Sequence, residues 1–182
     1  MRSVPVGYSE IQVPDPATSL RTASLTDAEA ITALINVAFQ VERFFLDGDR
    51  IGLPEVCERF ETGRFIVAED EAGMSGCVYI ELRGARAYLG LLSIAPERQR
   101  SGLGTLLTSA AEEFCRAYGC QAVDLLIVNL RKELPGYYRR LGYVENGTAP
   151  FPAGVQPKQP CHFLKMSKPL RVEDGSRNKT WH

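Results

Sequence analysis

Residues 88–107 read YLGLLSIAPERQRSGLGTLL, and this stretch predicts three consecutive elements. Apolar residues dominate up to Ile94, in a short run bounded by glycine and proline, which is typical of a buried strand. Pro96 ends the run, and a basic turn that contains Gly102 and Gly104 follows. Apolar residues then recur at helical spacing, which predicts an amphipathic helix with this inner face: Leu103, Leu106, Leu107, Ala110, Ala111, Phe114, Ala117 and Tyr118.

The glycine turn is suited to binding a phosphate group. The first N–H groups of a helix have no partner within the helix, and the helix dipole adds positive character there. Glycine lets the backbone approach a ligand closely, and Arg98 and Arg100 add full charges. The turn therefore predicts a phosphate or pyrophosphate site. A turn of this kind also allows close packing of strand against helix, and that alternative stays open at this point.

Two common nucleotide-binding motifs do not fit this turn. A dinucleotide fingerprint requires a third glycine three residues after the second, and Leu107 occupies that position. A Walker A loop requires Gly-Lys-Ser/Thr, and the turn has no lysine. The glycine pair alone therefore does not identify the phosphate ligand.

Two segments of the chain resemble motifs of the GNAT superfamily of N-acetyltransferases. Gln99 to Gly104, QRSGLG, resembles the family's Q/R-x-x-G-x-G/A loop. Tyr137 to Tyr143, YYRRLGY, resembles its aromatic-Tyr-x-x-x-Gly-aromatic segment. One helix and one strand separate the two segments, as in the family. The resemblance covers roughly residues 20–170 and implies that the phosphate ligand is the pyrophosphate of acetyl-CoA.

The resemblance also implies how acetyl-CoA is bound. The pyrophosphate would lie on backbone N–H groups of the glycine turn, with help from Gln99 and Arg100. The central strand of the family splays from its neighbour and offers backbone groups to the pantetheine arm and the thioester. The implied cofactor-binding residues are Leu92, Ser93, Ile94, Gln99, Arg100, Ser101, Gly102, Leu103, Gly104, Thr105, Asn129 and Arg131.

Tyr138 matches the family's tyrosine near the sulfur of CoA. The match implies that Tyr138 donates a proton or a hydrogen bond to the departing thiolate, while Tyr137 lies in the core. Many family members have an asparagine seven residues before this tyrosine, where it contacts the cofactor. Arg131 occupies that position here, and Asn129 at the end of the preceding strand is the alternative contact.

The sequence leaves the general base open. The central strand, residues 87–95, contains no acid, so Glu81, Asp124, Glu145 and His162 are candidates beside a water relay or an acceptor that arrives neutral. The adjacent Phe44 and Phe45 follow the first helix. In the family this segment lines the acceptor pocket, although two such aromatics can also plug the edge of the core.

The chain of 182 residues is long enough for one domain. The predicted fold is mixed α/β (α+β): a single GNAT-like domain with a central mixed, mostly antiparallel sheet flanked by helices. We expect an extended arm at residues 1–18, the domain at 19–170 and a polar tail at 171–182, in which Trp181 has no explained role. Thr26 and Glu29 predict a capping box for the first helix.

Composition narrows the functional class. The net charge of -1 provides no overall field for nucleic acid or an anionic membrane. No apolar stretch is long enough to span a bilayer, and the N-terminus lacks a signal-peptide core. Five cysteines without CxxC spacing favour a reducing cytoplasm and no disulfides. Cys161 and His162 lack the further Cys or His residues that a metal site requires.

These observations and the resemblance together predict an acetyl-CoA-dependent N-acetyltransferase. We expect direct attack of an amine, from a small-molecule acceptor, on the thioester. One alternative is a domain that binds acetyl-CoA without catalysis, and a second is a module for nucleotide phosphates. The resemblance also implies a possible homodimer.

Overall fold

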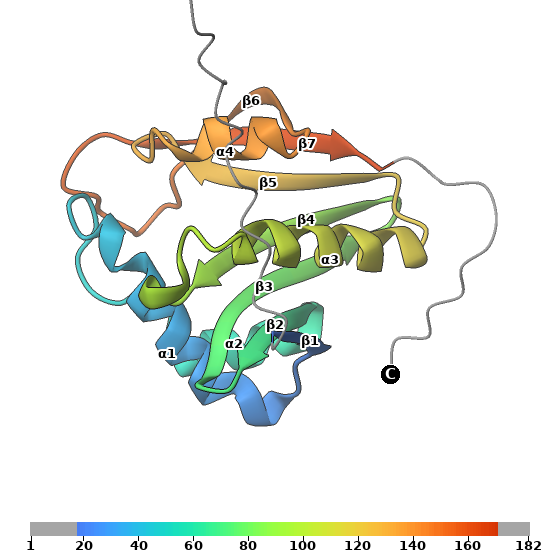
Figure 1. The fold of residues 1–182 in the computed structure, drawn as a ribbon. Coiled ribbons are helices and arrows are strands. Elements are labelled where there is room, and N and C mark those ends of the chain that lie inside the picture. Colours follow the sequence, from blue (N-terminus) through green and yellow to red (C-terminus); the bar gives the residue numbers. More distant parts are fainter. Residues whose placement is uncertain (1–17, 171–182) are drawn as a thin grey trace, which may run out of the picture.

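The computed structural model describes residues 18–170, which form a seven-stranded sheet with helices on both faces (Figure 1). The strand order is β1-β2-β3-β4-β5-β7-β6, and only β4 and β5 run parallel. The predicted central sheet, mixed, mostly antiparallel and flanked by helices, is confirmed. The elements are β1 Ser19–Thr22, α1 Ala28–Ala38, α2 Leu53–Thr62, β2 Arg64–Asp70, β3 Gly73–Arg83, β4 Arg86–Ile94, α3 Leu103–Ala117, β5 Ala122–Val128, α4 Leu134–Arg140, β6 Val144–Pro150 and β7 His162–Pro169.

The predicted arm, except its last residue, and the predicted tail with Trp181 lie outside the described residues. The domain boundaries therefore stay a prediction. Three short 3-10 segments, Leu25–Asp27, Phe39–Glu42 and Pro96–Arg98, connect the described elements.

The sheet separates two hydrophobic cores. One lies beneath α1 and α2 and contains Ile31, Val56 and Tyr79. The other lies beneath α3 and includes Leu107, with Tyr138 of α4 packed against it. Helices α3 and α4 therefore cover one face of the sheet, while α1 and α2 lie against β2, β3 and β4 on the other.

Helix α3 buries most of the residues predicted for its inner face, but the prediction was wrong for two of them. Ala117 and Tyr118 are exposed, Tyr118 to 62%, because the helix ends at Ala117 and the chain turns through Gly119 with φ +80°. The helix instead buries Glu112. The Glu112 carboxylate accepts hydrogen bonds from Tyr143 Oη at 3.0 Å and Lys168 Nζ at 2.7 Å. These bonds offset the free-energy cost of burying a charged group.

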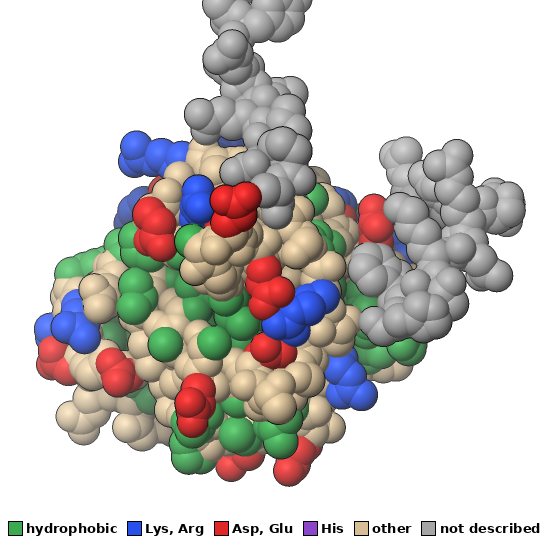
Figure 2. All heavy atoms as spheres, turned by 60° about the horizontal axis from the view of Figure 1, so that its bottom comes forward, with side chains coloured by type: hydrophobic (Ala, Val, Ile, Leu, Met, Phe, Trp, Pro, Cys, Tyr) green, Lys and Arg blue, Asp and Glu red, His purple; other side chains and the backbone are tan. Residues whose placement is uncertain are grey.

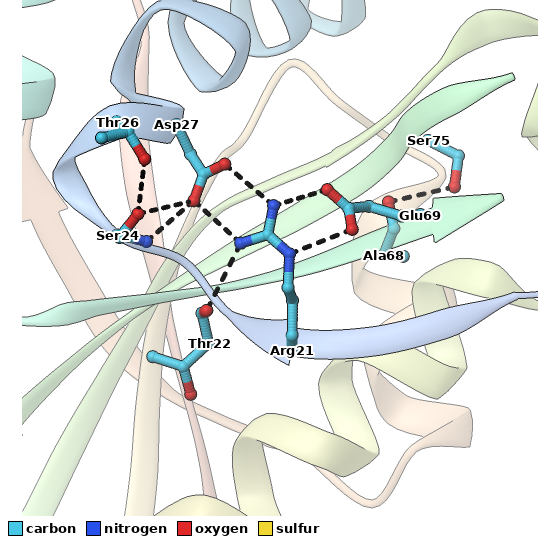
Figure 3. A network of polar contacts seen from close by, with 8 residues as sticks. All are labelled: Arg21, Thr22, Ser24, Thr26, Asp27, Ala68, Glu69 and Ser75. Atoms are coloured by element: carbon cyan, nitrogen blue, oxygen red, sulfur yellow. Dashed lines mark hydrogen bonds and ion pairs between the residues drawn. The ribbon is translucent and has the colours of Figure 1, made fainter. Parts of the chain in front are cut away.

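An ion-pair network joins β1, the 3-10 turn before α1, and β2 (Figure 3). The guanidinium of Arg21 donates two hydrogen bonds of 2.8 Å to Asp27 and two more to Glu69. Asp27 also accepts a hydrogen bond of 2.8 Å from the Ser24 N–H group. The capping box is therefore Ser24 with Asp27, and the predicted pair of Thr26 and Glu29 was wrong, because the helical path begins earlier, in the 3-10 turn.

Replacing Arg21 with glutamine should lower the free energy of unfolding by about 1–2 kcal/mol at pH 7, an estimate reduced for the partial exposure of the pair. Hydrogen bonds from Arg21 lower the pKa of Asp27 to about 2. A carboxyl with a lowered pKa stabilises the fold above the unfolded pKa of about 3.9, and this stabilisation is lost as the pH falls towards 2. Urea unfolding at pH 7 and pH 2.5 should show the difference between wild type and variant shrinking at low pH.

The control for this experiment is Arg64→Gln, because Arg64 donates only to backbone carbonyls, including that of Gly63 at 2.8 Å. An equal difference between wild type and Arg21→Gln at both pH values would contradict the assigned role of Asp27.

Figure 2 shows one side of the described surface. Acidic, basic and hydrophobic side chains are interspersed there, with no extended patch of one sign. Within residues 18–170, each helix falls short of the length and hydropathy that a bilayer crossing requires.

Candidate active site

The site begins where β4 and β5 separate. Their pairing runs from Arg86 with Ala122 to Leu89 with Leu125 and then stops. Strand β4 continues to Ile94 and β5 to Val128, so the following residues of β4 have no strand partner on this side. Backbone groups of Leu92, Ser93 and Ile94 therefore lie along a split between the two strands. The splayed strand that the resemblance implied is present.

A bulge in β4 accompanies this split. Tyr79 pairs with Gly90 and Cys77 with Ser93, so two residues of β4 lie opposite one residue of β3. Leu91 adopts a left-handed φ of +52°, and its carbonyl accepts a hydrogen bond of 2.9 Å from Ser93 Oγ. A bulge bends the strand that carries it, which turns the end of β4 away from β5.

The predicted glycine turn lies at the end of β4 and opens α3. Gly102 has φ +82°, and the first helical hydrogen bond runs from the Leu106 N–H group to the Gly102 carbonyl at 3.0 Å. The amides of Leu103, Gly104 and Thr105 therefore have no helical partner. Ser101 Oγ closes the turn by donating to the Arg98 carbonyl at 2.7 Å.

The two arginines of the turn differ in their contacts: Arg98 is paired with a carboxylate, whereas Arg100 is exposed to solvent. Arg98 pairs with the nearly buried carboxylate of Asp70 at 2.9 Å, so it anchors the turn to the end of β2. Arg100 is exposed, with a left-handed φ of +64°. Gln99 is also exposed and makes only a long bond of 3.4 Å to the Ile94 carbonyl. Arg100 and Gln99 are therefore the side chains of the turn that remain available to a ligand.

Tyr137 closes the other side of this turn. Its hydroxyl is enclosed and has no hydrogen-bond partner among the described residues. A Cβ atom added at Gly104 would lie 2.9 Å from that hydroxyl. An unpartnered buried hydroxyl beside free amides fits a ligand that carries several oxygen acceptors, as a pyrophosphate does. The residues present thus fit a diphosphate-bearing cofactor.

Tyr138 lies beside Tyr137, with ring centroids 5.0 Å apart, and beside Tyr143 at 5.6 Å. Burial raises the pKa of the Tyr138 hydroxyl well above its usual value, whereas the nearby Arg131 lowers it. The phenol is therefore protonated at neutral pH and is able to donate. Among residues 18–170 it has no hydrogen-bond partner.

Asn129 and Arg131 already have protein partners. Asn129 Oδ1 accepts a hydrogen bond of 2.9 Å from the His162 N–H group, which holds the start of β7. Arg131 pairs with Glu133 at 2.6 Å and with Glu42 at 3.1 Å. The predicted contacts of these two residues with the cofactor stay untested, and their observed contacts organise the loop after β5.

Sequence reasoning missed Glu42, which lies in the 3-10 turn after α1 and is only 8% exposed. Burial raises the pKa of its carboxyl, although Arg131 and Arg50 oppose the rise. Its ion pair with Arg131 brings the end of α1 to the loop between β5 and α4. The turn has no sequence periodicity, so only the presence of an acid directly after an apolar helical face could have indicated this residue.

The acids that the sequence offered as general bases are paired elsewhere. Glu81 binds Arg83 at 2.7 Å, Asp124 binds Arg86 and Ser167, and Glu145 binds Arg139 at 3.2 Å. Hydrogen bonds from these arginines lower the pKa of Glu81 and of Asp124, which makes both carboxylates weaker bases. His162 has an exposed side chain at the start of β7.

Phe44 and Phe45 differ in burial, and their predicted contact with the acceptor stays a prediction. Phe45 is fully buried and belongs to the core edge, whereas Phe44 is 51% exposed and contacts Phe45 edge to face at 4.9 Å. The loop between β6 and β7 covers this segment (Figure 1). The N–H group of Lys158 donates to the Phe45 carbonyl at 2.8 Å, and its ammonium pairs with Asp47 at 2.7 Å.

An open hollow of about 560 Å³ lies on the sheet face opposite α3. Neighbouring strands contribute Tyr88 from β4, Asp124 and Leu126 from β5, and Lys165 from β7. Tyr88 pairs in register with Asp124, and one further pair, Leu89 with Leu125, separates them from the split. The hollow thus approaches the split between β4 and β5 on the face opposite the glycine turn and α3.

Comparison with known proteins identifies the same architecture. Residues 61–145 match the family model described as an acetyltransferase (GNAT) domain. No curated protein sequence matches the chain.

Solved structures extend the likeness across the described chain. A nourseothricin acetyltransferase is 24% identical, with 85% of this chain and 99% of that chain covered and a TM-score of 0.68. A phosphinothricin acetyltransferase from Sinorhizobium meliloti in complex with AcCoA is 20% identical, with 88% and 92% covered and a TM-score of 0.68. The ribosomal-protein-S18-alanine N-acetyltransferase from Escherichia coli is 15% identical, with 90% and 99% covered and a TM-score of 0.68. At these identities the solved structures show a shared fold.

Proposed function

We propose that the protein is an acetyltransferase of the GNAT superfamily, whose domain model its residues 61–145 match, and that it transfers the acetyl group of acetyl-CoA to an amine of a small-molecule acceptor. The observation that carries the proposal is the split between β4 and β5, which opens at the end of β4 that precedes the free amides of α3, while a hollow lined by Tyr88 and Asp124 lies beside the paired part of the two strands. A cofactor with a long arm and a reactive end would span such a split, and an acceptor would reach that end from the other side.

The glycine turn supplies the proposed cofactor cradle. The amides of Leu103, Gly104 and Thr105 donate to the pyrophosphate, and Arg100 adds a full positive charge. The Tyr137 hydroxyl, which has no protein partner, adds a donor. The backbone of Leu92, Ser93 and Ile94, which has no partner in β5, hydrogen-bonds the pantetheine arm and orients the thioester carbonyl.

Acetyl-CoA supplies an activated acyl group when it is bound. The amine nitrogen attacks the carbonyl carbon, the C–N bond forms, the C–S bond breaks, and the sulfur leaves with the electron pair. The ammonium form of the acceptor loses one proton before the attack, and the attacking nitrogen loses a second. Glu42, held by Arg131, accepts a proton on this path, directly or through water, and Tyr138 donates one to the thiolate.

Replacing Tyr138 with phenylalanine should separate an enzyme from a domain that only binds acetyl-CoA. We expect kcat to fall about tenfold, because a thiolate is a moderately good leaving group and water can replace part of the proton donation. The dissociation constant for acetyl-CoA, measured by calorimetric titration, should stay within about twofold of wild type. Thiol release with a panel of amines gives the rate.

Two outcomes would contradict this assignment. Binding of acetyl-CoA without thiol release from any amine would favour the non-catalytic domain. Competition by ATP against acetyl-CoA with similar affinity would favour a general nucleotide-phosphate module. The expected homodimer and the cytoplasmic location stay predictions, and sedimentation of the purified protein tests the first of them.

A further inference from the structure

Three arginines on the side of α1 and α2 lie over aromatic rings. Arg50 lies 5.3 Å from the ring centroid of Phe39, Arg59 lies 5.1 Å from that of Tyr79, and Arg83 lies 4.7 Å from that of Tyr88. All three rings belong to or pack against the core beneath α1 and α2. The rings hold the guanidinium groups in place but do not neutralise them.

These arginines differ in their charge partners. Arg83 forms an ion pair with Glu81 at 2.7 Å. Among residues 18–170, no carboxylate forms an ion pair with Arg50 or Arg59, and neither side chain donates a hydrogen bond. Two guanidinium groups with five donors each thus remain free on one side of the molecule.

Of the three guanidinium groups, that of Arg83 lies directly over the ring of Tyr88. Burial raises the pKa of Tyr88, and Arg50, Arg59 and Arg83 are each near enough to oppose the rise. Tyr88 is half-buried and its hydroxyl makes no hydrogen bond within the described chain. It also lines the hollow beside the β4–β5 split. Arg59 lies over Tyr79, which pairs with Gly90, the first residue of β4 beyond its pairing with β5, so this guanidinium lies beside the start of the split.

This positive group is distinct from the phosphate cradle. The cradle is the glycine turn at the start of α3, which packs against the core beneath that helix. Arg50, Arg59 and Tyr88 lie on the opposite face of the sheet. Arg59 lies near enough to Glu81, and Arg50 near enough to Glu42, to lower the pKa of each carboxyl, but the ion pairs of these carboxylates are with Arg83 and Arg131.

We propose that the acceptor amine also carries an acidic group, in the simplest case a carboxylate, which Arg50 and Arg59 bind while the amine reaches the split. This inference rests on the proposed acetyl transfer. The planar guanidinium fork matches the two oxygens of a carboxylate, and the Tyr88 hydroxyl adds a neutral donor. Such an acceptor is an amino acid or a similar zwitterion, which distinguishes it from polyamines and from simple alkylamines.

The test compares each of the common amino acids with its own amide, which keeps the amine and the side chain but lacks the negative charge. Thiol release with saturating acetyl-CoA gives kcat and KM for each probe. We expect kcat/KM for the best amino acid to exceed that of its amide by at least about tenfold. In Arg59→Gln and Arg50→Gln, KM for the amino acid should rise about tenfold, and KM for the amide should stay unchanged.

Arg140→Gln is the matched control, because it removes an exposed guanidinium from α4 on the opposite face. It should alter neither KM. Amides or polyamines that react as well as the amino acids would overturn this inference and leave acetyl transfer intact. Equal effects of Arg59→Gln on both probes would also overturn it.

A separate binding measurement distinguishes the two proposals. Calorimetric titration of the CoA-saturated protein with the amino acids tests the acid-binding site without turnover. If acetyl-CoA itself does not bind, the proposed function fails. If acetyl-CoA binds but no amino acid binds to the CoA-saturated wild-type protein, only the present inference fails. The same holds if the amino acids bind to the Arg59→Gln variant as tightly as to wild type.

Discussion

Replacing Gly104 with glutamate should weaken the binding of acetyl-CoA at least about 100-fold, because it adds a negative charge where the helix presents free amides. A side chain at Gly104 would also displace Tyr137, since an added Cβ atom would lie 2.9 Å from the Tyr137 hydroxyl. The new carboxylate would compete with the pyrophosphate for the amides of Leu103 to Thr105. Calorimetric titration with acetyl-CoA measures the loss directly.

The control is Ser109→Glu, which adds the same charge to an exposed position further along α3. This variant should bind acetyl-CoA like wild type. Circular dichroism and thermal melting should show that Gly104→Glu remains folded, and the conservative Gly104→Ala variant should show a smaller loss of affinity in the same direction. If a folded Gly104→Glu protein binds acetyl-CoA with wild-type affinity, the turn does not bind the cofactor and serves only the packing of strand against helix.

Replacing Glu42 with glutamine should lower kcat about 100-fold, the range found when a positioned base is removed. The change keeps the size of the side chain and one hydrogen bond to Arg131, so the affinity for acetyl-CoA should be unchanged. Burial raises the pKa of Glu42, and only its ionised form accepts a proton. The rate for wild type should therefore rise with pH through a value above the usual range of a glutamate, and this limb should be absent in the variant.

Glu133→Gln is the matched control for Glu42→Gln. Glu133 binds the same guanidinium of Arg131, at 2.6 Å, but its side chain is 61% exposed. If kcat fell only because Arg131 was no longer held in place, kcat would fall in both variants. If Glu42 accepts a proton in the reaction, kcat should fall in Glu42→Gln alone. Equal pH profiles for wild type and Glu42→Gln would contradict the role of Glu42. The proton would then be lost to water, or the acceptor would arrive as the neutral amine.

The sequence predicted the elements that depend on local pattern. The strand, glycine turn and helix of residues 88–117 follow from apolar spacing and from two glycines, and the structure places each close to its expected bounds. It failed where the partner of a side chain comes from a distant segment. Glu42 and Arg131 are 89 residues apart in sequence, and their ion pair carries no signal in either local pattern.

The same limit applies to other polar side chains. The side-chain oxygen of Asn129 holds the N–H group of His162, which only the pairing of β5 with β7 brings near. Glu112 would be expected on the exposed side of α3, and its burial depends on Tyr143 and Lys168 from beyond the helix. Long-range polar partners decide such positions.

The short parallel pairing between β4 and β5 also has a consequence for how the domain assembles. Strands β1 to β4 form one antiparallel block, and β5 to β7 form another, while only the pairs from Arg86 to Leu89 with Ala122 to Leu125 join the two blocks within the sheet. Each block closes mainly through nearby segments, so the seam requires the longer crossover through α3. A ligand that contacts both strands binds only after the blocks have docked, and mass action then shifts the chain towards the docked state.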